Sequence, residues 1–116
     1  IFNTLYEAGL VPTNGTDPPV DEIDPIGSFA CSVTRILPDG SKFQPDEVYS
    51  REVALYSYTM GNAIAAFEED IKGSIKVGKL ADIAILSQDL ITVPDDKIMD
   101  TEILMTILGG KVVYRR

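Results

Sequence analysis

The stretch Gly73-Ser-Ile-Lys-Val-Gly-Lys-Leu-Ala-Asp-Ile-Ala-Ile-Leu86 decides the fold of this sequence. Gly78 can adopt a positive φ, so a tight turn at Val77-Gly78-Lys79 carries no steric cost. The run 82–87 that follows has nearly continuous apolar positions, which is typical of a strand buried on both faces. The stretch therefore predicts a short β segment at Ser74-Ile75, joined by this turn to a buried strand.

Length and charge narrow the functional classes. The chain has 116 residues, 10 of them basic and 18 acidic, and its net charge is −8. Such a charge argues against nucleic acid and anionic membrane surfaces as partners. No apolar run approaches the roughly 20 residues that a membrane helix needs, and we expect a cytoplasmic location. The single cysteine, Cys31, is expected to be an ordinary buried thiol.

Helix signals dominate the first two thirds of the sequence. Asp24 before Pro25 is a strong helix start, Ser50 is a good N-cap for a third helix, and Thr59 is the expected cap of a fourth. A short buried strand is expected at Leu10–Thr13, and Pro38-Asp39-Gly40 predicts a turn. The expected helices are 1–8, 25–35, 51–58 and 60–67.

The C-terminal end is predicted to form a helical turn near Pro94 followed by a β-hairpin. Gly109-Gly110 is a two-residue loop suited to a primed turn between strands 104–108 and 111–115. Strict pairing across this loop leaves one wholly apolar side, which needs a second layer to cover it. The predicted pairs are Leu108–Lys111, Ile107–Val112, Thr106–Val113 and Met105–Tyr114.

Three further blocks occur with the central stretch in a fixed order: 14–20 (Asn-Gly-Thr-Asp-Pro-Pro-Val), 50–59 (Ser-Arg-Glu-Val-Ala-Leu-Tyr-Ser-Tyr-Thr) and 109–114 (Gly-Gly-Lys-Val-Val-Tyr). Together the four blocks resemble the C-terminal end of metal-dependent amidohydrolases of the amidohydrolase 3 type. One departure is Val77, where the family often has proline, so the turn lacks a residue that presets φ.

The resemblance implies an α/β fold that is incomplete on its own. Residues 1–67 would be the last helix, eighth strand and terminal helices of a (β/α)8 barrel, and residues 68–116 would be strands of a small β-sandwich. The chain is then a fragment of a longer enzyme. That enzyme would hydrolyse an amide-type C–N bond of a small molecule with a water activated by a divalent metal, with zinc as the expected ion.

Asp17 is the candidate catalytic and metal-binding residue. In amidohydrolases that resemble this chain, the aspartate ending the eighth barrel strand binds metal and accepts the proton of the attacking water, and Gly15-Thr16-Asp17 matches that position, with threonine where the family commonly has serine. The alternative is that Asp17 only stabilises a proline-rich turn. Because the sequence has no histidine and a catalytic zinc takes about three protein ligands, we expect the chain alone to bind no metal and to be inactive.

Other candidates are weaker, and two rival functions stay open. The acidic run 21–24 lacks the ligand spacing of a calcium loop. The pattern 73–79 superficially resembles a phosphate loop, but Leu80 stands where such a loop has serine or threonine, and a strand follows where it has a helix. Arg35 either reaches an anionic substrate group or simply complements a helix C-terminus. The first rival function is an interaction module that forms a homodimer through an open sheet edge, and the second is a small complete enzyme that uses carboxylates. The tyrosines expected to pack rather than to line a pocket are Tyr49, Tyr56 and Tyr58.

Overall fold

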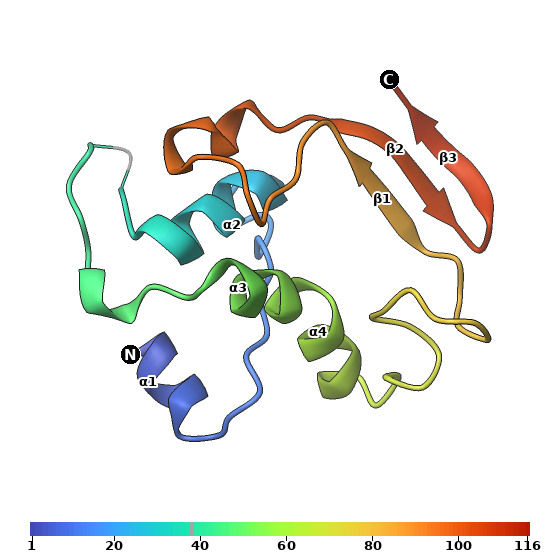
Figure 1. Cartoon of the computed structure of the whole chain (residues 1–116), viewed down its shortest axis with the longest axis horizontal. Coiled ribbons are helices and arrows are strands. Elements are labelled where there is room, and N and C mark those ends of the chain that lie inside the picture. Colours follow the sequence, from blue (N-terminus) through green and yellow to red (C-terminus); the bar gives the residue numbers. More distant parts are fainter. Residues whose placement is uncertain (38) are drawn as a thin grey trace.

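A computed structural model of the chain describes residues 1–37 and 39–116, so Pro38, the first residue of the turn predicted at 38–40, lies outside the described residues. Within them, helices occupy the N-terminal part and an antiparallel sheet the C-terminal part (Figure 1). None of the described helices is long and apolar enough to cross a membrane. The elements are α1 (Phe2–Glu7), α2 (Pro25–Thr34), α3 (Arg51–Tyr58), α4 (Met60–Ala65), β1 (Ile83–Leu86), β2 (Ile103–Leu108) and β3 (Lys111–Arg115), with 3-10 turns η1 (Pro45–Glu47) and η2 (Asp95–Asp100).

Local capping signals predict the helices well, with one exception. The Asp24 carboxylate accepts hydrogen bonds from the N–H groups of Ile26 (3.1 Å) and Gly27 (3.0 Å) at the start of α2. The Ser50 hydroxyl accepts the N–H of Val53 (3.2 Å) at the start of α3. Thr59 is the N-cap residue of α4, as predicted, but its side chain makes no capping hydrogen bond. Its hydroxyl instead donates to the carbonyl of Leu55 (2.8 Å), one turn back in α3.

Two predicted β segments are not strands in the structure. Residues 10–13 have no regular secondary structure, with Leu10 and Val11 exposed and only Pro12 buried, and Ile75 is 85% exposed. A strand forms only when a neighbouring strand takes up its N–H and C=O groups. The strands among the described residues pair only with one another, so neither segment has such a neighbour.

The central stretch forms its turn and its strand, but the strand is less buried than predicted. Gly78 has a φ of +94°, and the N–H of Lys79 donates to the carbonyl of Lys76 (3.1 Å). The prediction that the strand is buried on both faces is wrong, because Ala84 and Ile85 are exposed. The sheet extends beside the helices instead of lying between two layers (Figure 1).

The hairpin forms around Gly109-Gly110 with a different register beyond its second pair. Leu108 pairs with Lys111 and Ile107 with Val112, as predicted, but the register shifts between Thr106 and Ile107. Thr106 then pairs with Tyr114 and Met105 with Arg115, so the predicted Thr106–Val113 and Met105–Tyr114 pairs are wrong. Val113 is the extra residue of a bulge, which strict alternation cannot anticipate. β3 is an edge strand, exposed along its whole length.

The core lies between α2, α3 and the segment that contains η2. One cluster of buried side chains combines residues from before and after the predicted domain boundary at residues 67 and 68. Residues on both sides of the boundary thus share one core, and the division into two domains stays a prediction. The cluster consists of Phe29, Ala30, Ala54, Leu90, Val93 and Ile98.

Arg51 connects α3 to the segment that precedes η2. Its guanidinium donates to the carbonyls of Leu90 (2.6 Å) and Val93 (2.8 Å) and forms an ion pair with Asp95 (2.5 Å). Only 16% of the Arg51 side chain is exposed, so its hydrogen bonds are largely shielded from water, which strengthens them.

We expect Arg51→Ala to lower the free energy of unfolding by about 2 kcal/mol, because two backbone carbonyls lose charge-assisted hydrogen bonds. Urea unfolding followed by circular dichroism measures the change. The control is Arg116→Ala, which removes an exposed ion pair with Glu102 and should cost less than about 0.5 kcal/mol. Equal effects of the two substitutions would show that Arg51 does not join these segments.

Candidate functional site

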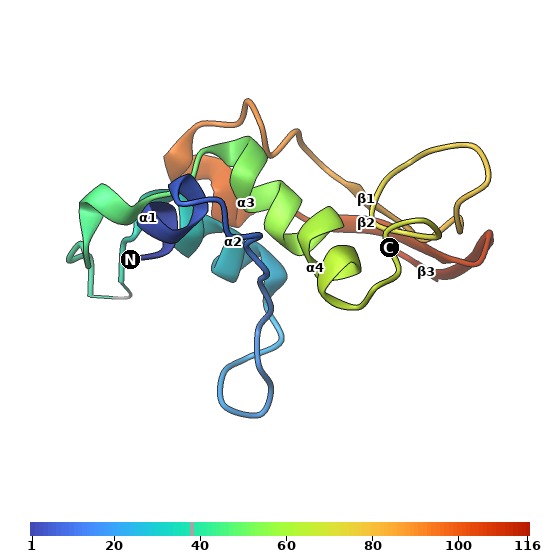
Figure 2. The same cartoon turned by 90° about the horizontal axis from the view of Figure 1, so that it is seen from below.

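The loop that carries Asp17 connects α1 and α2 and projects away from the helices (Figure 2). Asp17 is exposed and has a φ of +51°, a left-handed conformation that few residues other than glycine adopt. Its carbonyl accepts the N–H of Val20 (2.9 Å), which closes a turn. Its carboxylate forms no hydrogen bond with any described residue, so the backbone holds the turn and the carboxylate faces solvent.

Asn14 fixes the start of this loop to three helices. Its N–H donates to the carbonyl of Ser57 (3.1 Å) and to Oδ1 of Asn62 (3.2 Å), and its carbonyl accepts Nδ2 of Asn62 (2.8 Å). The Asn14 side chain donates to the Ser32 hydroxyl (2.9 Å) and accepts the N–H of Gly15 (2.9 Å). The chain is therefore held by α2, α3 and α4 three residues before Asp17.

The segment that leads into the loop passes against the start of α4. A Cβ placed on Gly61 would lie 2.1 Å from the Pro12 carbonyl oxygen and 3.2 Å from that of Tyr56. Real Cβ atoms do not approach backbone oxygens so closely, so only glycine fits at position 61 in this arrangement. The close approach of Pro12 to Gly61 and the hydrogen bonds of Asn14 hold residues 12–14 against the helices.

The sequence alone does not point to Asn14, Gly61 or Asn62 as residues that hold the loop. In the sequence, Gly61 indicates only a weakened helix. Asn14 and Asn62 are 48 positions apart, and no local periodicity reports a pairing at that distance. The local signal is an asparagine beside a glycine within a short helix, which many sequences share.

A cavity of ≈ 800 Å³ opens beside Asn14, at the start of the Asp17 loop, and lies over α2. Asn14, Gly15 and Cys31 line it, while Asp17 does not. Cys31 is half-buried, less than the buried thiol expected. Arg35 is the one cation among the described lining residues. The acidic lining residues are Asp21, Glu22, Asp24, Glu47, Asp95 and Asp96.

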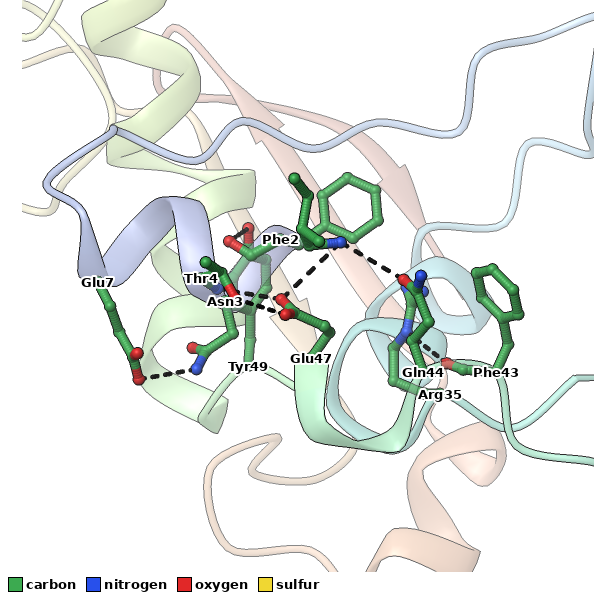
Figure 3. Close-up of polar contacts among 10 residues, drawn as sticks. Phe2, Asn3, Thr4, Glu7, Arg35, Phe43, Gln44, Glu47 and Tyr49 are labelled. Atoms are coloured by element: carbon green, nitrogen blue, oxygen red, sulfur yellow. Dashed lines mark hydrogen bonds and ion pairs between the residues drawn. The ribbon is translucent and has the colours of Figure 1, made fainter.

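The contacts of Arg35 explain how this cation is buried. Its Nε donates to the carbonyl of Phe43 (3.1 Å), and its guanidinium carbon lies 5.3 Å from the Phe2 ring centre and 5.4 Å from that of Phe43 (Figure 3). Two aromatic faces and a carbonyl stabilise a cation that has lost most of its water. Arg35 also ends α2 in a left-handed conformation, with a φ of +55°. A substrate contact is not needed to account for it.

Glu47 and Tyr49 form a polar cluster beside Arg35 that fixes α1 (Figure 3). The Thr4 hydroxyl (2.5 Å) and N–H (3.0 Å) donate to the Glu47 carboxylate and lower its pKa. The Tyr49 hydroxyl donates to the carbonyl of Phe2 (3.2 Å), and burial, with the nearby Glu47 charge, raises the pKa of Tyr49. Burial likewise raises the pKa of Tyr58, which packs against the core.

The described residues do not by themselves assemble a metal centre. Across residues 1–37 and 39–116 no group of three histidine, cysteine, aspartate or glutamate side chains is arranged to hold a metal ion. The Asp17 carboxylate is an oxygen donor of the kind that divalent metals accept, and it makes no hydrogen bond to the described residues. It fits the role of one ligand, and a complete site needs further ligands.

The sequence model of the amidohydrolase family matches residues 2–114. The chain belongs to the amidohydrolase family. This confirms the resemblance drawn from the four sequence blocks. Because the match covers nearly the whole chain, it includes the loop of Asp17 and the sheet up to Tyr114.

Two curated proteins illustrate the relationship. The chain is 35% identical over 115 residues to "Protein LONG AFTER FAR-RED 3" of Arabidopsis thaliana, covering 98% of this chain and 20% of that protein. It is 26% identical over 113 residues to the N-substituted formamide deformylase of Arthrobacter pascens, covering 97% and 21%. The chain thus spans about a fifth of the length of these relatives.

A solved structure shows the same fold. The amidohydrolase of Thermotoga maritima MSB8 matches with a TM-score of 0.70 at 22% identity, over 97% of this chain and 25% of that one. At this identity the likeness concerns the fold alone. The mixed arrangement of helices and a three-stranded antiparallel sheet is therefore one that an amidohydrolase contains.

Proposed function

We propose that this chain is the C-terminal segment of a metal-dependent amidohydrolase, and that the whole protein hydrolyses amide-type C–N bonds of small molecules. The family match over residues 2–114 carries the proposal. The deformylase of Arthrobacter pascens, named for N-substituted formamides, supports this substrate class. In this proposal residues 1–67 end a (β/α)8 barrel, and residues 68–116 contribute strands to a β-sandwich. The proposed partners include neither nucleic acid nor membrane.

Asp17 is the residue of this chain to which we assign chemistry. A divalent metal, with zinc the first candidate, would supply Lewis acidity and a more acidic water when bound. The exposed Asp17 carboxylate would provide one oxygen ligand and accept the proton that the attacking water gives up. Because the sequence has no histidine, the remaining ligands must come from outside these residues. The isolated chain is therefore proposed to be inactive.

One observation favours the alternative function, an interaction module. β3 is exposed along its length at the edge of the sheet, and exposed edges pair with other strands. A second copy of the chain could add a strand there and form a homodimer. The hydrolase proposal instead assigns that edge to strands of the same longer protein, so the two proposals differ in whether catalysis exists at all.

Metal removal tests the hydrolase proposal. In the longer protein, dialysis against a chelator should lower the hydrolysis of N-substituted formamides by at least ~10²-fold, and added zinc should restore it, because the metal supplies the Lewis acid. Metal content is measured alongside the rate. The 116-residue chain under the same conditions should show no turnover. Full activity of metal-free protein would overturn metal dependence, and a longer protein without activity on any amide would favour the module.

A further inference from the structure

We propose that Asn62 is a positioning residue that sets the place of Asp17 by pairing its side-chain amide with the backbone of Asn14. The inference rests on the proposed function, because it concerns the residue to which that function assigns chemistry. Asn62 lies in α4, 48 positions beyond Asn14, and contacts the Asn14 backbone. The Asn14 side chain contacts Ser32 in α2.

The pairing uses both hydrogen-bonding groups of the Asn14 backbone. The Asn14 N–H donates to Oδ1 of Asn62 (3.2 Å), and Nδ2 of Asn62 donates to the Asn14 carbonyl (2.8 Å). A neighbouring strand would satisfy the same two groups. Residues 10–13 have no such strand among the described residues, so at Asn14 the Asn62 amide takes that place, and the Ser57 carbonyl shares the Asn14 N–H with it.

A second contact fixes Asn14 from α2. Its side chain donates to the Ser32 hydroxyl (2.9 Å), which in turn donates to the carbonyl of Ser28 (2.9 Å). Three residues beyond this anchor span at most about 10 Å, and the turn from Asp17 to Val20 restricts the path further. The place of the Asp17 carboxylate therefore depends on where Asn14 is held.

Asparagine suits position 62 because one planar group carries both a donor and an acceptor. Leucine has nearly the same shape and offers neither. Ionised aspartate offers only acceptors, so it would repel the Asn14 carbonyl, whereas protonated aspartate restores one donor and one acceptor. These bonds are half-buried, which raises the cost of leaving the Asn14 carbonyl unpaired, whereas the Asn14 N–H keeps the Ser57 carbonyl (3.1 Å) as a second acceptor.

The first test is Asn62→Leu in the longer enzyme, with Asn3→Leu as the matched control. Asn3 also donates a side-chain hydrogen bond, to Glu7 (2.9 Å), but lies in α1 away from the loop. We expect Asn62→Leu to increase hydrogen–deuterium exchange in residues 10–20 and to lower kcat by ~10-fold or more with little change in KM, because a misplaced catalytic group slows the chemical step. Equal exchange in the two variants would overturn the proposal.

The second test is Asn62→Asp, which separates hydrogen bonding from packing. At neutral pH the introduced carboxylate should leave residues 10–20 as exchangeable as in Asn62→Leu. On acidification it gains a proton, donates to the Asn14 carbonyl, and protection should return when labelling times are scaled to the intrinsic exchange rate. Protection that ignores pH would contradict a hydrogen-bonding role. This variant also decides the question if Asn62→Leu fails to fold.

The two proposals fail separately. If Asp17→Asn leaves kcat unchanged, the catalytic assignment is wrong, while the exchange experiment still decides whether Asn62 orders the loop. If Asp17→Asn abolishes turnover but Asn62→Leu matches Asn3→Leu in both exchange and kcat, only the positioning role is wrong.

Discussion

Replacing Asp17 by asparagine is expected to lower kcat of the proposed longer enzyme ~10³-fold, the loss typical of removing a general base, which is the role proposed for Asp17. Asparagine keeps the size of the side chain and tolerates a left-handed backbone as aspartate does, so the φ of +51° adds no strain. The substitution removes the negative charge and the proton acceptor, and it replaces one carboxylate oxygen by an NH2 donor. Steady-state kinetics with metal analysis of the same samples measures the effect and separates lost chemistry from lost metal.

The control for this substitution lies in the same loop. Asp21 is exposed, and its carboxylate accepts only the N–H of the following residue, Glu22 (2.9 Å), among the described residues. We expect Asp21→Asn to leave kcat within about twofold of the unmodified enzyme, because nothing assigns chemistry to it. If Asp17→Asn behaves like Asp21→Asn, Asp17 is only a turn residue, as the alternative interpretation of the sequence holds.

Features set by adjacent residues could be predicted from the sequence. Asp24 and Ser50 cap the helices that they precede, and Gly78 and Gly109-Gly110 make the turns expected of them. Each of these depends on a backbone conformation or a hydrogen bond within a few residues. Such features can be recognised in a single sequence because they do not depend on which distant segments lie nearby in the fold.

Features set by distant segments could not be predicted. Residues 10–13 have β propensity but no partner strand among the described residues, and Val113 bulges where strict alternation predicts a pair. Asp17 could be predicted as a site residue because the sequence around it resembles a family motif. The Asn14–Asn62 pair that holds its loop is visible only in the structure. Propensity gives the tendency of a segment, and the neighbours available in space decide the outcome.

Gly61→Ala has the largest stability effect that we expect, a loss of about 3 kcal/mol in the free energy of unfolding. Two effects oppose each other at this position. Alanine within a helix gains about 1 kcal/mol over glycine from its higher propensity. The new Cβ would lie 2.1 Å from the Pro12 carbonyl oxygen, and that oxygen belongs to backbone that cannot rotate away. The steric term therefore outweighs the propensity term, and the substitution destabilises the protein.

Urea unfolding of Gly61→Ala against Gly15→Ala checks this balance. A Cβ added to Gly15 would meet no atom within 4 Å beyond its own chain neighbours, and the backbone there is not left-handed, so Gly15→Ala should change stability by less than about 0.5 kcal/mol. Because Pro12 lies two residues before Asn14, Gly61→Ala should also loosen residues 10–20 in hydrogen exchange. A Gly61→Ala protein as stable as the unmodified one would mean that the segment does not pass against α4, and the anchor of the Asp17 loop would then need another explanation.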